Sequence, residues 1–303
     1  MLLMSCNHLF YYPTSKVYYD FSSFPHKAHE FYLSSSYDET KLHGVKISGR
    51  TKDFSEKKEK SMHPILKKIY ETKEKRNIFK GKTLLLYIHG NAENISSHFW
   101  NVAWIIPFGI DVLIIDPRGF GQSEGSVHHE NIGRDMSDIL SWAIKEKKEK
   151  SYENLVVFGQ SLGGTLLLKA IEREKMIKAV DLIFIDSSFL SYKEMTKEKI
   201  KETFLLWPLF PFYKILISDE ESPQKKNFIS KENLPFLLVS HGREDEIVPY
   251  HLGEKLFHFY PAEKIMWPIE EGNHIDIFMK HQDKYRWDFI YLLEEKLIFK
   301  NNH

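Results

Sequence analysis

From about residue 83 onward, short apolar runs alternate with segments of helical spacing. The apolar runs are TLLLYI, IDVLII, NLVVF, VDLIFI, PFLLVS and KIMWPI, and several of them end at glycine, aspartate or histidine. The segments between them carry apolar residues three and four positions apart. Apolar strands that alternate with helices are typical of a mostly parallel sheet covered by helices on both faces. We therefore predict an α/β fold around such a sheet.

Three segments depart from this alternation. Residues 30–48 hold two patches of alternating polarity around Asp38-Glu39 and predict an antiparallel hairpin. Residues 51–82 are rich in Lys and Glu, and we interpret them as a surface insertion. Residues 187–233 contain the apolar run TFLLWPLFPFY between two late strands, and we predict a short lid there. We divide the chain into an N-terminal segment, 1–29, and one domain, 30–303, with the lid at about 187–233.

Composition removes several function classes. The chain has 303 residues, and its 42 Lys and Arg residues balance 42 Asp and Glu residues. A neutral balance does not favour a nucleic-acid partner. A single cysteine excludes a disulfide within the chain and a cysteine-based zinc site. No pair of histidines has the spacing of H-E-x-x-H, so we predict no metal and no cofactor.

The one cysteine, Cys6, closes the opening hexapeptide MLLMSC. This stretch resembles the end of a bacterial lipoprotein signal, but it lacks the charged and long apolar regions of a complete signal peptide. Two hypotheses remain open. The protein is anchored in a bacterial cell envelope, associated with the membrane through a lipid on Cys6, or it is cytoplasmic and has a free thiol. The chain has no apolar run of about 18 residues that predicts a transmembrane helix.

The most informative motif is GQSLG, residues 159–163, between a predicted strand and a predicted helix. This is the G-x-S-x-G pattern of a nucleophile elbow in the context that the pattern requires. Glycines leave space for a tight turn, which presents the Ser161 hydroxyl at the N-terminus of the helix. We therefore predict that Ser161 is a nucleophile.

A serine nucleophile needs a base and an acid that orients the base. In this type of fold the chain order is serine, acid, histidine. Asp245 follows a late strand and has Glu244 and Glu246 as neighbours, while His274 follows the last strand. We interpret the nearby Asp276 as a helix cap.

An oxyanion requires two aimed donors. We predict the backbone N–H groups of Leu162, directly after the nucleophile, and of Asn91, in the loop after the first strand of the alternating region. His89 is expected to hold that loop through hydrogen bonds.

These motifs together resemble the alpha/beta hydrolase family, from about Glu30 onward. The motifs are HGNA (89–92), DPRGFGQSEG (116–125), GQSLGG (159–164), and HGREDEIVP followed by GNH. The chain is most similar to the serine-aminopeptidase-like branch, which includes bacterial lipoproteins and eukaryotic enzymes that remove fatty acyl groups from protein cysteines. The resemblance selects Asp245 over its acidic neighbours and implies a Ser161–Asp245–His274 triad in a metal-free hydrolase. It also implies that Arg118 and Ser123 brace the loops near the site.

Three functional hypotheses follow. The first is a serine hydrolase that cleaves carboxylic esters or thioesters through an acyl-enzyme on Ser161, acting on a small or acylated hydrophobic substrate. The second is a serine peptidase or aminopeptidase with the same triad. The third is a catalytically silent binding protein, against which an intact triad speaks. The aromatic lid favours the first.

Overall fold

The structure is a computed structural model. It describes residues 11–49, 77–202, 204–213, 217–229, 232–279 and 282–299. Cys6 and most of the predicted insertion, residues 51–76, lie outside these ranges. Residues 77–82 form a turn, in which the N–H groups of Asn77 and Phe79 donate to the carbonyls of Pro107 and Phe108.

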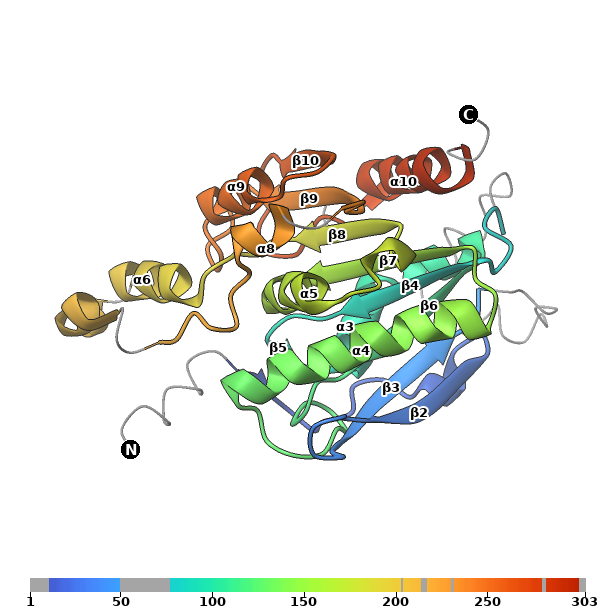
Figure 1. The fold of residues 1–303 in the computed structure, drawn as a ribbon, viewed down its shortest axis with the longest axis horizontal. Coiled ribbons are helices and arrows are strands. Elements are labelled where there is room, and N and C mark those ends of the chain that lie inside the picture. The colour runs from blue at the N-terminus through green and yellow to red at the C-terminus, as the bar shows by residue number, and fades with distance from the viewer. Residues whose placement is uncertain are drawn as a thin grey trace.

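The central sheet has eight strands in the order β10-β9-β8-β7-β4-β6-β3-β2. In chain order they are β2 Ala28–Ser34, β3 Lys41–Ile47, β4 Thr83–Ile88, β6 Ile110–Ile115, β7 Asn154–Gln160, β8 Leu182–Asp186, β9 Phe236–Gly242 and β10 Lys264–Ile269. The six strands from β4 to β10 in this sheet run parallel, and β2 and β3 form an antiparallel hairpin at one end (Figure 1). The predictions of a mostly parallel sheet and of the hairpin are confirmed.

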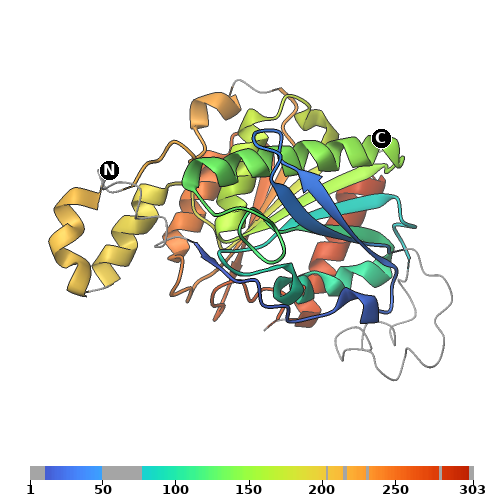
Figure 2. The ribbon, with the colours of Figure 1, turned by 90° about the horizontal axis from the view of Figure 1, so that it is seen from below.

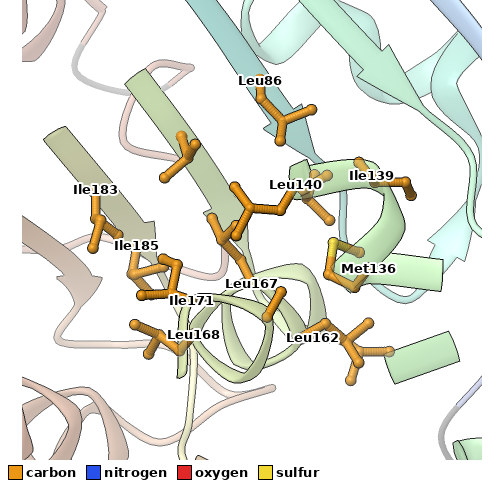
Figure 3. Close-up of a cluster of buried hydrophobic side chains, with 14 of the residues drawn as sticks. Leu86, Met136, Ile139, Leu140, Leu162, Leu167, Leu168, Ile171, Ile183 and Ile185 are labelled. Carbon is orange, nitrogen blue, oxygen red and sulfur yellow. The ribbon is translucent and has the colours of Figure 1, made fainter. Parts of the chain in front are cut away.

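Helices cover both faces of the sheet. One face packs against α4 His129–Glu149, α5 Leu162–Arg173 and α9 Tyr250–Phe259. Figure 3 shows the interlocking aliphatic side chains there, with Leu140 of α4 and Leu167 of α5 between the two helices and the strands. The other face packs against aromatic residues that include Phe99 and Trp104 and against α10 Gln282–Leu293. Burial on both faces explains why the parallel strands are apolar throughout.

The segment that follows the loop after β4 is not the single helix that its spacing of apolar residues predicts. It consists of α3 Ile95–His98, η5 Phe99–Asn101 and η6 Ala103–Phe108, the last two being 3₁₀ turns. Pro107 lies inside η6, where it cannot donate a backbone hydrogen bond, and Gly109 ends the turn with φ of 86°. All six residues of η6 are buried, so packing decides the local conformation.

The predicted lid forms a cap that follows β8. It contains α6 Tyr192–Glu202 and the 3₁₀ segment η8 Phe204–Phe212, which stand away from the sheet in both ribbon views (Figures 1 and 2). Two prolines inside η8 prevent a long α-helix. The Asp219 carboxylate joins the two ends of the cap, since it accepts hydrogen bonds from the Ser191 hydroxyl (2.8 Å), the Lys193 N–H (3.1 Å) and the Ser222 hydroxyl (2.8 Å).

Several large apolar side chains of the cap are exposed. The exposed fraction is 84% for Leu205 and 57% for Trp207, and Phe210 and Phe212 are exposed as well. These side chains therefore do not pack the cap onto the core.

Residues 11–29, placed in the N-terminal segment by the sequence, pack on this domain. Tyr11, Phe21 and Phe24 are buried in its cores. A short strand, β1 Tyr12–Pro13, pairs with β5 Ala92–Glu93 in the loop after β4. The remaining short elements are η3 Phe21–Ser23, η7 Ile177–Ala179, α8 Lys225–Ile229 and the π-helical turn η9 Glu294–Ile298.

Candidate active site

Ser161 occupies a sharp turn between β7 and α5. Its backbone has φ of 52° and ψ of −126°, a strained conformation for a residue with a side chain. A Cβ at Gly159 would lie 2.7 Å from the Cα of Gly164, and one at Gly163 would lie 2.4 Å from the carbonyl oxygen of His89. The glycines are therefore required by close backbone contacts, as the sequence predicts. The Ser161 hydroxyl makes no capping bond to α5, which leaves it available to another partner.

The partner of Ser161 is His274, 113 positions away in sequence. The distance from Ser161 Oγ to His274 Nε2 is 3.0 Å, and His274 Nδ1 lies 2.8 Å from Asp245 Oδ2. Because Nδ1 faces a carboxylate, it carries the hydrogen and Nε2 accepts from the hydroxyl. The structure thus brings together the three residues that the sequence selected.

The carboxylate of Asp245 is buried, while Glu244 and Glu246 are exposed. Its Oδ1 accepts hydrogen bonds from the N–H groups of Ile247 (2.9 Å) and Val248 (2.8 Å). Burial acts to raise the pKa of Asp245, but the imidazoles of His241 and His274 outweigh it and hold this pKa below its usual range. Asp245 is therefore an anion suited to orient an imidazole.

The loop that carries His274 is held at its next residue. The N–H of Ile275 donates to the hydroxyl of Ser187, 3.1 Å away, and Ile275 has φ of 52°. Asp276 is not a helix cap, because α10 begins only at Gln282. Its carboxylate accepts instead from the N–H of Asn273 at 2.9 Å and closes the turn around His274.

The expected oxyanion side lies next to Ser161. A Cβ built on Gly90 would be 3.4 Å from the Ser161 Cβ, so the loop after β4 passes directly beside the hydroxyl. The next residue, Asn91, accepts a backbone hydrogen bond from Tyr12 at 3.1 Å. Leu162 begins α5, where N–H groups have no partner within the helix, and its side chain points into the core (Figure 3).

His89 holds this loop, as expected. Its Nδ1 lies 2.8 Å from the carbonyl oxygen of Gly90, and its Nε2 lies 3.0 Å from Asp116 Oδ1. The same carboxylate oxygen accepts from the N–H of Ile95 at 2.9 Å. Asp116, at the end of β6, therefore ties both ends of the loop that contains Asn91.

The turn after Asp116 is braced by Arg118 and Ser123. The Arg118 guanidinium binds Asp135 of α4 through two bonds, of 2.6 and 2.7 Å, and reaches Asp38 in the hairpin turn at 2.8 Å. The Ser123 hydroxyl donates to the carbonyl of Asp116 at 2.7 Å. These bonds fix the turn to a helix and to the hairpin.

Three buried residues around the site were not selected from the sequence: Asp186, Ser187 and His241. Asp186 accepts from the Ser240 hydroxyl at 2.6 Å and from the Gln160 amide at 2.9 Å, and burial raises its pKa. All three stand at the carboxyl ends of β8 and β9, which is the signal that could have identified them. Within the described residues no group of three potential ligands could hold a metal ion.

The sheet and the serine elbow define an α/β hydrolase fold. Residues 80–231, about half of the chain, match the sequence model of the family described as serine aminopeptidase, S33, and the chain belongs to this family. The matched range contains Ser161 and both expected oxyanion donors, and it ends before Asp245 and His274.

Relatives with similar sequences extend the comparison. The protein YfhR of Escherichia coli K12 is 30% identical over 203 residues, which cover 67% of this chain and 66% of YfhR. The chain thus spans just under two thirds of that relative. Lysophosphatidylserine lipase ABHD12 of Gallus gallus is 27% identical over 217 residues, or 67% of this chain and 55% of the lipase.

Solved structures share the fold. The Pyrococcus furiosus esterase Pf2001 superposes with a TM-score of 0.66 at 15% identity, covering 95% of this chain and 98% of the esterase. The acylaminoacyl peptidase of Pyrococcus horikoshii has a TM-score of 0.58 at 15% identity, covering 91% of this chain and 43% of the peptidase. At such identities the likeness concerns the fold alone. Among the described residues, every helix is too short or too polar to cross a bilayer.

Proposed function

We propose that the protein is a serine hydrolase that cleaves carboxylic esters or thioesters through an acyl-enzyme on Ser161. The observation that carries the proposal is the continuous chain of short contacts from the Ser161 hydroxyl through His274 to the Asp245 carboxylate. A hydroxyl is a weak nucleophile, and a base within hydrogen-bond distance is what activates it.

In the proposed reaction, Ser161 Oγ attacks the carbonyl carbon and His274 Nε2 takes the hydroxyl proton. The tetrahedral oxyanion accepts hydrogen bonds from the N–H groups of Leu162 and Asn91. His274 then protonates the leaving alcohol or thiol as the acyl-enzyme forms. Water, deprotonated by the same imidazole, releases the acid, while Asp245 orients and stabilises the imidazolium.

The substrate is proposed to be hydrophobic. The cap that carries the apolar segment reaches the acid loop through α6, where Lys199 donates to the carbonyl of Glu246 at 3.4 Å. An aminopeptidase would need carboxylates aimed at the substrate amine near Ser161. Two acids of the cap have other partners, since Glu198 pairs with Lys201 and Asp219 joins the cap ends. This favours an ester or thioester substrate over a peptide with a free amino terminus.

The proposal is tested with a fluorophosphonate probe and a panel of substrates. Wild-type protein should become labelled on Ser161, and Ser161→Ala should not. Against p-nitrophenyl esters of increasing chain length and aminoacyl anilides, the esters should be hydrolysed and the anilides should not. Ser188→Ala is a poor control because Ser188 bonds to the carbonyl of Ser161, so Ser36→Ala, at an exposed turn, serves as the matched variant. Labelling of Ser161→Ala at the wild-type rate would refute the proposal.

A further inference from the structure

The loop that carries Asp245 is held by a second histidine, His241 of β9. The His241 side chain is completely buried. Its Nε2 lies 2.7 Å from the carbonyl oxygen of Val248 and 3.3 Å from Asp245 Oδ2. Both neighbours are acceptors, so Nε2 carries a hydrogen and donates it. His241 thereby closes the loop from Asp245 to Val248 against the end of the strand.

The contact with Asp245 involves the oxygen that matters for the triad. Oδ2 is the atom that accepts from Nδ1 of His274 at 2.8 Å. The other oxygen, Oδ1, is already occupied by two backbone N–H groups of the loop. Two imidazoles therefore face one carboxylate oxygen. Because Oδ2 also faces the N–H of His241, it is a weaker hydrogen-bond acceptor for His274.

A glycine in the next helix reserves the position of the His241 ring. A Cβ at Gly253 of α9 would lie 2.1 Å from His241 Nδ1 and 2.8 Å from its Cγ. Glycine within a helix costs about 1 kcal/mol relative to alanine. The cost at Gly253 is explained by the ring that packs against its bare Cα, which leaves His241 little freedom to turn.

Other charged and titratable groups face this pair from the neighbouring elements. Asp186, at the end of β8, interacts with the charges of both His241 and His274. The Tyr250 ring of α9 stands edge-on to the His241 ring at 5.8 Å, and the Arg243 guanidinium lies 4.8 Å from the centre of the Tyr250 ring. None of these groups is removed in a variant that changes His241 alone.

We propose that His241 is a positioning residue of the candidate triad, which holds the acid loop and shares Asp245 Oδ2 with His274. This inference rests on the proposed function. The His241 side chain is completely buried, so it does not meet a bound substrate and acts through Asp245. Without the N–H of His241, Asp245 Oδ2 accepts from His274 alone. The carboxylate then stabilises the protonated form of His274 more strongly, so that this form persists to higher pH.

The test measures the rate at which a fluorophosphonate modifies Ser161 between pH 5 and 9. This rate needs neutral His274 but no knowledge of the natural substrate. In His241→Leu, the midpoint of the acid limb should rise by about 0.5–1 pH unit, while the plateau at high pH stays within about threefold of wild type. His241→Gln, whose amide supplies a donor near the same place, should restore the wild-type midpoint.

Two further variants make the result decisive. Gly253→Ala should displace the ring and raise the midpoint in the same direction without touching the triad. His26→Leu removes another buried histidine, which lies before β2 and bonds the backbone carbonyl of Ser48 at 3.0 Å. This variant should leave the midpoint unchanged.

The outcomes separate this inference from the proposed function. An unlabelled wild-type protein contradicts the proposed function itself. Normal wild-type labelling with a lower plateau but an unmoved midpoint in His241→Leu overturns only the role of His241, because packing alone would then explain it. Loss of folding in both His241→Leu and Gly253→Ala, checked by circular dichroism, overturns that role as well.

Discussion

The hydroxyl oxygen of Ser187 accepts a hydrogen bond from the N–H of Ile275, 3.1 Å away, and so links the end of β8 to the residue after His274. Both residues have positive φ, 50° and 52°, and for a β-branched residue such as isoleucine this is a rare conformation. Ser187 is buried, so water cannot replace the bond. The strained pair keeps the His274 loop over Ser161.

Loss of this bond should impair the reaction more than it impairs folding. In Ser187→Ala the N–H of Ile275 loses its acceptor, a part-buried hydrogen bond that contributes about 1 kcal/mol. We expect kcat for a short ester to fall about tenfold with KM nearly unchanged. Steady-state kinetics measures this. Ser35→Ala removes another buried serine hydroxyl, which donates to Asp138 of α4. This variant should leave kcat unchanged. Equal kinetic effects in both variants would argue against a role for Ser187 at the site.

The loop after β4 should depend on Asp116 for its structure. Asp116→Ala leaves the His89 ring and the N–H of Ile95 without their acceptor inside the protein. We expect a loss of about 3 kcal/mol in the free energy of unfolding, measured with urea, together with a lower kcat. Asp138→Ala removes a partly exposed carboxylate that accepts from Ser36, and water can replace it, so the loss should stay below about 1 kcal/mol. A cost at Asp116 no greater than that at Asp138 would contradict this account.

His98 should make stability depend on pH. Burial lowers the pKa of His98 from 6.5 to about 4, and the charge of His89 adds to this. Between these values the unfolded chain binds a proton that the folded protein does not, so the free energy of unfolding falls as pH drops from about 6.5 to 4. His98→Phe should lose less stability over this window, as measured by urea unfolding at several pH values. His258→Phe changes an exposed histidine of α9 and should follow the wild-type curve. A His98→Phe curve parallel to wild type would show that His98 is not the group involved.

The exposed apolar residues of η8 should matter for long acyl chains. Leu205→Ser combined with Trp207→Ser should leave the Tm nearly unchanged, because both side chains are exposed. We expect the ratio of kcat/KM for a decanoyl ester over an acetyl ester to fall about tenfold, since one buried apolar side chain contributes about 1.5–3 kcal/mol.

Met176→Ser is the matched control for the cap. Met176 is 58% exposed and lies between α5 and β8, outside the cap. This variant should keep the wild-type ratio. An unchanged ratio in the cap variant would mean that these side chains do not meet the acyl chain.

Local patterns in the sequence determined much of this protein. The apolar runs predicted the strands, because a parallel sheet buried on both faces excludes polar side chains along its length. The elbow at Ser161 could be predicted because its tight turn leaves no space for side chains at the flanking glycine positions. Chain order and the family resemblance then selected Asp245 and His274.

Tertiary structure alone decided the rest. The segment after β4 forms 3₁₀ turns because long-range packing outweighs local propensity there. The exposure of the cap side chains follows from the position of the cap away from the sheet (Figure 1). Asp276 closes a turn since no helix begins beside it. The contact of Ser187 with Ile275 joins the ends of β8 and β10, 88 positions apart along the chain, and the Asp245 oxygen that His241 faces also accepts from His274, which lies in the loop after β10. Such contacts depend on sheet order and register, which no local spacing of residues encodes.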